Sequence, residues 1–156
     1  CWTSYIREQV EANPQLAQDH VPIAAMVDSG CYAHVLPVNM VRPTQLRPSP
    51  MSQRGEDFTA ANGSTIKNYG MTNVIGVSEG GQDVEIPFNV AGVKRPLLST
   101  TQLTQNGHKI NLETDNNYIH LKNGHRIPLT IVNGSPALII WRKREDHPTS
   151  KNGRRD

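Results

Sequence analysis

The apolar positions of this chain either alternate with polar ones or gather in short runs, and both patterns are typical of β-strands. Residues 22–27 are almost continuously apolar, which predicts a strand buried on both faces. A second short apolar run covers residues 35–41. Further segments of strand type follow, most of them separated by Gly, Pro or Asn-Gly, at residues 58–60, 65–69, 73–77, 84–90, 109–112, 118–121, 127–132 and 137–141. The pattern predicts many short strands joined by tight turns.

Helical patterns are rare in this chain. Residues 3–12 predict a possible short helix that ends at Asn13-Pro14. Residues 99–105 predict one or two helical turns, with a cap-like serine at the start and Asn106-Gly107 as the stop. Residues 42–55 contain three prolines and no hydrophobic period, which predicts a surface loop. The expected fold is therefore almost all-β, with one short helix inside the domain and a second short helix at the N-terminus.

The length of 156 residues suits one domain with a core of its own. Residues 1–20 form a lead-in, residues 21–141 the domain, and residues 142–156 a charged, solvated linker. We find no internal repeat and no second domain. The chain begins at Cys1 and not at Met, so we expect it to be part of a longer protein.

Composition and charge exclude several classes of protein. The formal net charge of +2 is too small to argue for nucleic acid, and the basic clusters at 142–144 and 151–155 lack stacking aromatics beyond Trp141. No run approaches 18 apolar residues, and no charged-then-apolar leader opens the chain, so neither a membrane span nor secretion is expected. Cys1 and Cys31 are too few for a disulfide framework, which favours a reducing, cytoplasmic setting.

Asp28-Ser29-Gly30 is the first candidate for chemistry. It lies between the two apolar runs, so a strand would deliver an aspartate into a tight glycine turn before a second strand leaves. Such an arrangement holds a carboxylate at the floor of a cleft. The same tripeptide is also an ordinary turn sequence, because Asp and Ser bond their own backbone and Gly tolerates positive φ. The rest of the chain must decide between the two interpretations.

The order of three segments resembles that of the retropepsins, the retroviral-type aspartic proteases, and most closely those of copia-like retroelements. The first segment is residues 27–31 with 34–36. The second is residues 59–70, which contain Asn62-Gly63, a strong hairpin signal. The third is residues 93–103, in which an apolar pair enters a helix, and residues 106–112 then resemble the closing strand.

The resemblance implies a retropepsin-like closed β-barrel and a homodimeric aspartic endopeptidase that cleaves a retroelement polyprotein without metal or cofactor. Asp28 of each chain would supply half of a dyad that shares one proton and activates a water. Ser29 would bond across the dimer axis, and Gly30 would let the two turns approach. The flap that closes over an extended peptide would have its tip at Ala61, Asn62, Gly63 and Ser64.

The chain departs from the family pattern at three places. Ser99 follows the apolar pair, where many retropepsins have Gly, although copia-like members also carry Ser. Cys31 stands where Ala is common. Residues 1–20 contain no clear counterpart of the family's opening strand, which is part of the dimer interface.

Other functions remain as alternatives. The main one is a catalytically silent retropepsin-like module that dimerises or binds peptides; an intact Asp28-Ser29-Gly30 argues against it. Residues 76–80 fit the G-x-S-x-G pattern of esterases, but a strand-like segment follows where that motif needs a helix. Cys31 and His34 are a weak candidate for a thiol and its base. The six histidines lack zinc-binding spacing, and most are expected at the surface, with His34 in a strand.

Overall fold

The computed structural model describes residues 2–148 and is mostly β, with 42% strand and 21% helix. The helices are α1 (Trp2–Ala12), α2 (Pro50–Gln53) and α3 (Thr100–Gln105). The strands are β1 (His20–Asp28), β2 (Val35–Pro37), β3 (Phe58–Thr59), β4 (Thr65–Ile66), β5 (Asn68–Ser78), β6 (Asp83–Ala91), β7 (Leu97–Ser99), β8 (Lys109–Asn111), β9 (Tyr118–His120), β10 (Arg126–Pro128), β11 (Thr130–Val132) and β12 (Ser135–Lys143).

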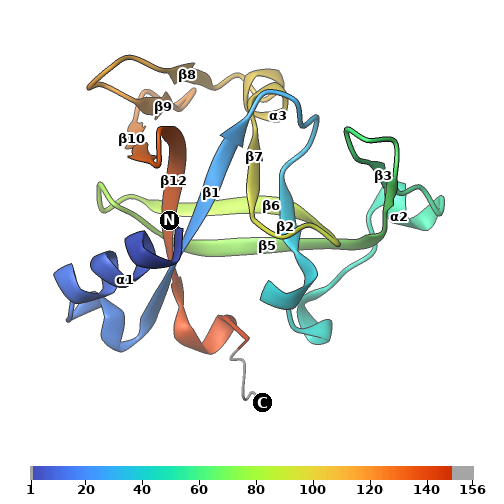
Figure 1. Cartoon of the computed structure of the whole chain (residues 1–156), viewed down its shortest axis with the longest axis horizontal. Helices are drawn as coiled ribbons and strands as arrows, with labels where there is room; N and C mark the ends of the chain where they lie inside the picture. The colour runs from blue at the N-terminus through green and yellow to red at the C-terminus, as the bar shows by residue number, and fades with distance from the viewer. Residues whose placement is uncertain (1, 149–156) are drawn as a thin grey trace.

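A seven-stranded mixed sheet forms the body of the molecule, in the order β1-β7-β2-β6-β5-β12-β11. The sheet closes into a ring because β1 also pairs with β12 (Figure 1). The long antiparallel β5–β6 hairpin runs across the other strands in this view. Three short strands, β2, β7 and β11, combine with four strands of nine or eleven residues, so the ring is built from longer strands than the sequence pattern predicts.

Apolar side chains from most of the ring meet in one main core. Its fully buried members include Leu36, Val74, Phe88 and Leu98, none of which exposes measurable surface. Two smaller sheets flank the ring, one of β10, β9 and β8 and one of β3 and β4. The first of these sheets adds Ile119 and Ile127 to the core.

The antiparallel neighbour of β1 comes from the far end of the sequence. Residues 2–12 form α1, which confirms the predicted N-terminal helix, and from residue 2 onward no strand precedes β1. Instead, β12 pairs with β1 over seven positions, from His20 opposite Lys143 to Met26 opposite Ala137. The place beside β1 is therefore filled by the C-terminal strand.

Residues 42–55 are not the irregular loop that the prolines predict. They contain a 3-10 turn at Pro43–Gln45 and the short helix α2. Ser49 caps α2 by accepting a hydrogen bond from the backbone N–H of Ser52 at 3.0 Å, and proline is tolerated in the first turn of a helix. The predicted strand at 35–41 is also shorter, because β2 ends at Pro37 and a 3-10 turn follows at Val38–Met40.

The predicted boundary between domain and linker at residue 141 falls inside β12. Arg142 is 1% exposed and donates to the carbonyl oxygen of Met40 at 2.6 Å. The backbone N–H of Arg144 donates to the carbonyl oxygen of Asp19 at 2.7 Å. Residues 142–148 are therefore packed against the domain, while the basic cluster at 151–155 lies outside the described residues. Within residues 2–148, no helix has the length and apolar character needed to cross a bilayer.

Candidate active site

Asp28 is the last residue of β1, where the ring has a distinctive topology. Strand β7 lies between β1 and β2, parallel to β1 and antiparallel to β2. The segment that connects β1 to β2, residues 28–34, therefore passes over the end of β7; we call it the Asp28 loop. In the parallel register Leu98 lies opposite Val27, and Ser99 lies opposite Asp28. The apolar pair of the third sequence segment, Leu97-Leu98, thus lies in β7 beside the end of β1 that carries Asp28.

The Asp28 carboxylate is held by its own turn. Its Oδ1 accepts a hydrogen bond from the backbone N–H of Gly30 at 2.8 Å, an Asx-type turn that leaves the second oxygen available. A Cβ on residue 30 would lie 3.3 Å from that same Oδ1, so any side chain there would crowd the carboxylate. Asp28 is partly exposed, and Ser29 and Gly30 are exposed. Glycine at 30 therefore keeps the approach to the carboxylate open.

The predicted hairpin at Asn62-Gly63 is confirmed. Strands β3 and β4 pair antiparallel, with Phe58 opposite Ile66. At the tip, the N–H of Gly63 donates to the carbonyl oxygen of Ala60 at 2.9 Å, and Gly63 has φ +87. The N–H of Ser64 donates to Asn62 Oδ1 at 2.9 Å. All four predicted tip residues are exposed, namely Ala61, Asn62, Gly63 and Ser64.

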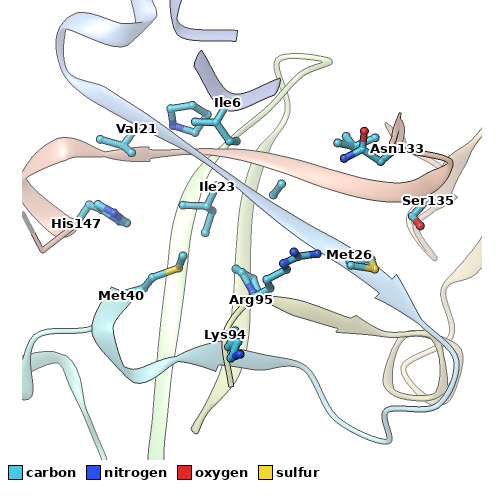
Figure 2. Close-up of a pocket in the computed structure, with 14 residues that line it drawn as sticks. Ile6, Val21, Ile23, Met26, Met40, Lys94, Arg95, Asn133, Ser135 and His147 are labelled. Carbon is cyan, nitrogen blue, oxygen red and sulfur yellow. The ribbon is translucent and has the colours of Figure 1, made fainter. Parts of the chain in front are cut away.

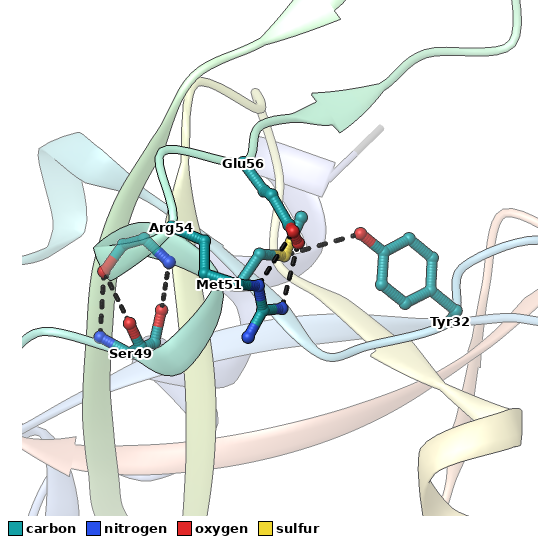
Figure 3. A network of polar contacts seen from close by, with 6 residues as sticks. Tyr32, Ser49, Met51, Arg54 and Glu56 are labelled. Carbon is teal, nitrogen blue, oxygen red and sulfur yellow. Dashed lines mark hydrogen bonds and ion pairs between the residues drawn. The ribbon is translucent and has the colours of Figure 1, made fainter.

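The base of this hairpin packs against the Asp28 loop. The rings of Tyr32 and Phe58 have centroids 5.7 Å apart, and Cys31 packs against a buried cluster that contains Phe58. On the other side, the Tyr32 hydroxyl donates to Met51 Sδ of α2 at 3.6 Å, and α2 is followed by an exposed ion pair between Arg54 and Glu56 (Figure 3). The fold thus brings two of the three sequence segments into contact.

A buried polar group beneath the Asp28 loop was not expected from the sequence. His34, expected as a strand residue, lies just before β2 and is 2% exposed. Its Nδ1 accepts a hydrogen bond from the backbone N–H of Ser99 at 2.9 Å. Burial, and secondarily the charge of nearby His108, lowers the pKa of His34 to about 4. The donor is the backbone N–H of Ser99, so no residue type in the sequence signals this contact.

The geometry disfavours both alternative nucleophiles. Cys31 Sγ donates to the carbonyl oxygen of Ala33 at 2.9 Å, and burial raises the pKa of this thiol. His34 Nδ1 accepts from Ser99, and no hydrogen bond joins Cys31 to His34 within residues 2–148. Ser78 of the G-x-S-x-G pattern is 2% exposed, donates to the side chain of Gln82 and stands in the β5–β6 hairpin, without the helix that an esterase needs.

A cleft of about 850 Å³ opens along β1 (Figure 2). Its lining is mainly apolar and includes Ile23, Met26 and Met40, with Lys94 and Arg95 on the side of the loop before β7. Among the described residues, β7 pairs with β1 only at 26–28, so the rest of this β1 edge has no partner strand. Asp28 itself does not line the cleft, which begins two residues before it.

Among residues 2–148, no three His, Cys, Asp or Glu side chains come together in a way that could hold a metal ion. Comparison with models of known protein families finds no match, and no curated protein matches the sequence.

Proposed function

We propose that this chain is one subunit of a homodimeric, retropepsin-like aspartic endopeptidase that cleaves peptide bonds in a retroelement polyprotein. The observation that carries the proposal is the position of Asp28. It ends a partly buried strand, its carboxylate is oriented by the N–H of Gly30, and β7 pairs with the strands on both sides of the loop. The carboxylate nevertheless remains partly exposed. A turn with only a structural role does not require this support.

The chemistry needs two carboxylates at hydrogen-bond distance that share one proton. Like charges so close cannot both ionise cheaply, so one member stays protonated and polarises the scissile carbonyl. The ionised member removes a proton from the attacking water. The two groups titrate as a unit, and activity falls when both are ionised.

A second copy of this chain must supply the other carboxylate. Of the seven aspartates in the sequence, only Asp28 stands in an Asp-Ser/Thr-Gly context. Ser29 and Gly30 are exposed in the single chain and are available to a two-fold related partner. The interface would therefore bring the two Asp28 loops together on the symmetry axis.

An extended peptide suits the surroundings of Asp28. The β3–β4 hairpin has two-residue strands and an exposed tip, features of an element that can open and close. The 850 Å³ cleft begins beside Met26 and offers an apolar floor along an unpaired strand edge. Backbone groups of such an edge can bind a peptide as an added strand.

The decisive experiment is the Asp28→Asn variant, with Asp115→Asn as the matched control. Asp115 is an exposed aspartate between β8 and β9, and its side chain makes no hydrogen bond or ion pair in the described part of the chain. Wild type and Asp115→Asn should cleave a proteome-derived peptide library, with new termini identified by mass spectrometry. Asp28→Asn should lose at least about 10³-fold in kcat/KM.

Mixing subunits separates the dimeric mechanism from other uses of Asp28. Excess Asp28→Asn protein should inhibit wild type by forming mixed dimers, because a mixed dimer contains only one competent carboxylate. Sedimentation should show dimers at the concentrations where activity appears. An Asp28→Asn variant that cleaves as fast as wild type would refute the aspartic mechanism. Wild type that dimerises and binds peptides but never cleaves them would favour the silent module.

A further inference from the structure

A closed set of hydrogen bonds joins the Asp28 loop to the start of α3. Ser99 Oγ donates to the carbonyl oxygen of Cys31 at 2.6 Å and accepts from the N–H of Gln102 at 3.0 Å. The N–H of Ser99 donates to His34 Nδ1 at 2.9 Å. Gln102 Oε1 in turn accepts from the N–H of His34 at 2.9 Å. The side chains of His34, Ser99 and Gln102 therefore each form at least one of these hydrogen bonds.

These contacts hold the loop at two points. Cys31 lies three residues after Asp28, and His34 lies six residues after it. The loop has no regular secondary structure between Asp28 and His34. Ser99 is fully buried and lies opposite Asp28 in the β1–β7 register. Buried hydrogen bonds are strong constraints, because breaking one leaves an unsatisfied polar group away from water. The loop can therefore shift only if the set of bonds breaks.

We propose that His34, Ser99 and Gln102 act together as a positioning clamp that orients the Asp28 carboxylate for the dyad. The inference rests on the proposed protease function. None of the three side chains needs to touch substrate. Their effect passes through the backbone of the Asp28 loop, which fixes where the carboxylate points relative to the dimer axis.

The clamp requires a neutral imidazole with Nδ1 unprotonated. A proton on Nδ1 would turn the acceptor into a donor that faces the N–H of Ser99, and the bond would be lost. The pocket around His34 also contains His108, and Asp83 and Glu85 of β6 line the same cavity. Burial keeps the pKa of His34 near 4, so the clamp is intact at neutral pH.

Two substitutions of His34 separate the acceptor from the ring. In His34→Asn the amide oxygen occupies about the place of Nδ1 and does not titrate, whereas His34→Leu has no acceptor. We expect His34→Leu to lower kcat by at least about 10-fold with a smaller change in KM. His34→Asn should stay within about 3-fold of wild type at pH 7. Its activity should also persist to lower pH than that of wild type, which a merely structural role would not produce.

Ser99→Ala tests the hydroxyl bonds of the clamp, and it remains a test of the proposal if His34→Leu does not fold. It removes both hydroxyl bonds and keeps the backbone N–H. The control is Thr104→Ala in α3, the helix that Ser99 caps; within the described residues its hydroxyl donates only to the carbonyl oxygens of Thr100 and Thr101. Amide exchange of residues 29–34 should accelerate at least about 10-fold in Ser99→Ala and remain unchanged in Thr104→Ala.

The exchange measurement does not depend on protease activity, so the two proposals can fail separately. An inactive wild type whose exchange responds to Ser99→Ala would overturn the protease and leave the clamp as a structural device only. Unchanged exchange and unchanged kcat in Ser99→Ala would overturn the clamp while Asp28→Asn still tests the protease. Equal losses in His34→Asn and His34→Leu would also overturn it, because the acceptor would then not matter.

Discussion

The Asp28 loop and the tip of the β3–β4 hairpin are held in different ways. The loop is fixed by one buried and one partly buried hydrogen bond to residues more than 60 positions away, at Ser99 and Gln102. The hairpin tip is fixed by bonds within five residues, from Ala60 to Ser64. One region depends on the tertiary fold, and the other depends on local turn chemistry.

This difference matches what a protease needs from each region. A catalytic carboxylate must keep its orientation within narrow limits, so its loop gains from a buried, cooperative network. A flap must open and close, so it gains from weak anchoring. Regions with few buried contacts open at low cost in free energy, whereas buried core elements open only with global unfolding. The predictions below test whether the two regions differ in this way.

The largest expected effect is on core packing behind the Asp28 loop. Leu98 of β7 is fully buried, and Leu98→Ala should lower the free energy of unfolding by about 4 kcal/mol, through lost transfer energy and a cavity. The matched change in the hairpin is Ile66→Ala. Ile66 is only partly buried, so this change should cost about 1 kcal/mol. Urea unfolding followed by circular dichroism measures both.

Equal losses in the two variants would show that the hairpin is part of the same cooperative unit as the loop. That result would contradict the separation between a fixed loop and a movable flap. A loss in Leu98→Ala near 1 kcal/mol would instead mean that the core behind the loop collapses around the smaller side chain.

The parts of the fold that follow local rules were predictable from the sequence. Asn62-Gly63 marks a hairpin because both residues tolerate the backbone angles of tight turns, and the hairpin is present. The short helix between Ser99 and Asn106 follows from its cap and its stop signal, and α3 spans Thr100–Gln105. The alternating segments also become strands, because one face of each packs on the core.

The parts that depend on distant contacts were not predictable. No local pattern says that β12 fills the place beside β1, since its register is set by packing across more than 100 residues. The burial of His34 could not be predicted for the same reason, because a single histidine before a strand does not indicate which distant residue it bonds. Arg142, assigned to a linker, is buried because Met40 provides an acceptor far away in the sequence.

Lowering the pH should reduce the free energy of unfolding by a smaller amount. The Asp28 loop should open before the rest of the core does. The pKa of His34 is about 4 in the folded protein and near 6.5 when unfolded, so the unfolded chain binds the proton more readily. Stability is therefore full above about pH 6.5 and declines as pH falls towards 4. At 1.36 kcal/mol per pKa unit, the part of this loss due to His34 is about 3 kcal/mol. Urea unfolding at pH 7, 5.5 and 4.5 measures it.

His34→Asn is the control for this pH dependence. This variant should lose the part of the pH-dependent stability that is due to His34 and keep the part due to His147. The pKa of His147 is also lowered to about 4, by burial and by the charges of Arg142, Arg42 and Arg144. Amide exchange in wild type at pH 4.5 should rise in residues 29–34 before it rises elsewhere in the core. If the free energy of unfolding of His34→Asn depends on pH as strongly as that of wild type, the acid sensitivity comes from other groups.

The smallest expected effect concerns the hairpin tip, where the chain supplies its own control. The turn of residues 121–125 repeats the bonds that backbone N–H groups donate within the tip: Gly124 N–H donates to the carbonyl oxygen of Leu121 at 2.9 Å, as Gly63 N–H does to that of Ala60. Both glycines have positive φ, +87 and +94, and open space around them.

Gly63→Ala and Gly124→Ala should therefore impose the same local strain of about 1 kcal/mol. If the β3–β4 hairpin is a flap, only Gly63→Ala should lower kcat/KM, by about 3- to 10-fold, because the strain shifts the tip away from the conformation that closes over the peptide. Steady-state kinetics on one library-derived peptide measures both variants. Equal kinetics in the two variants would mean that the tip does not touch the peptide, and substrate closure would then have to come from another part of the dimer.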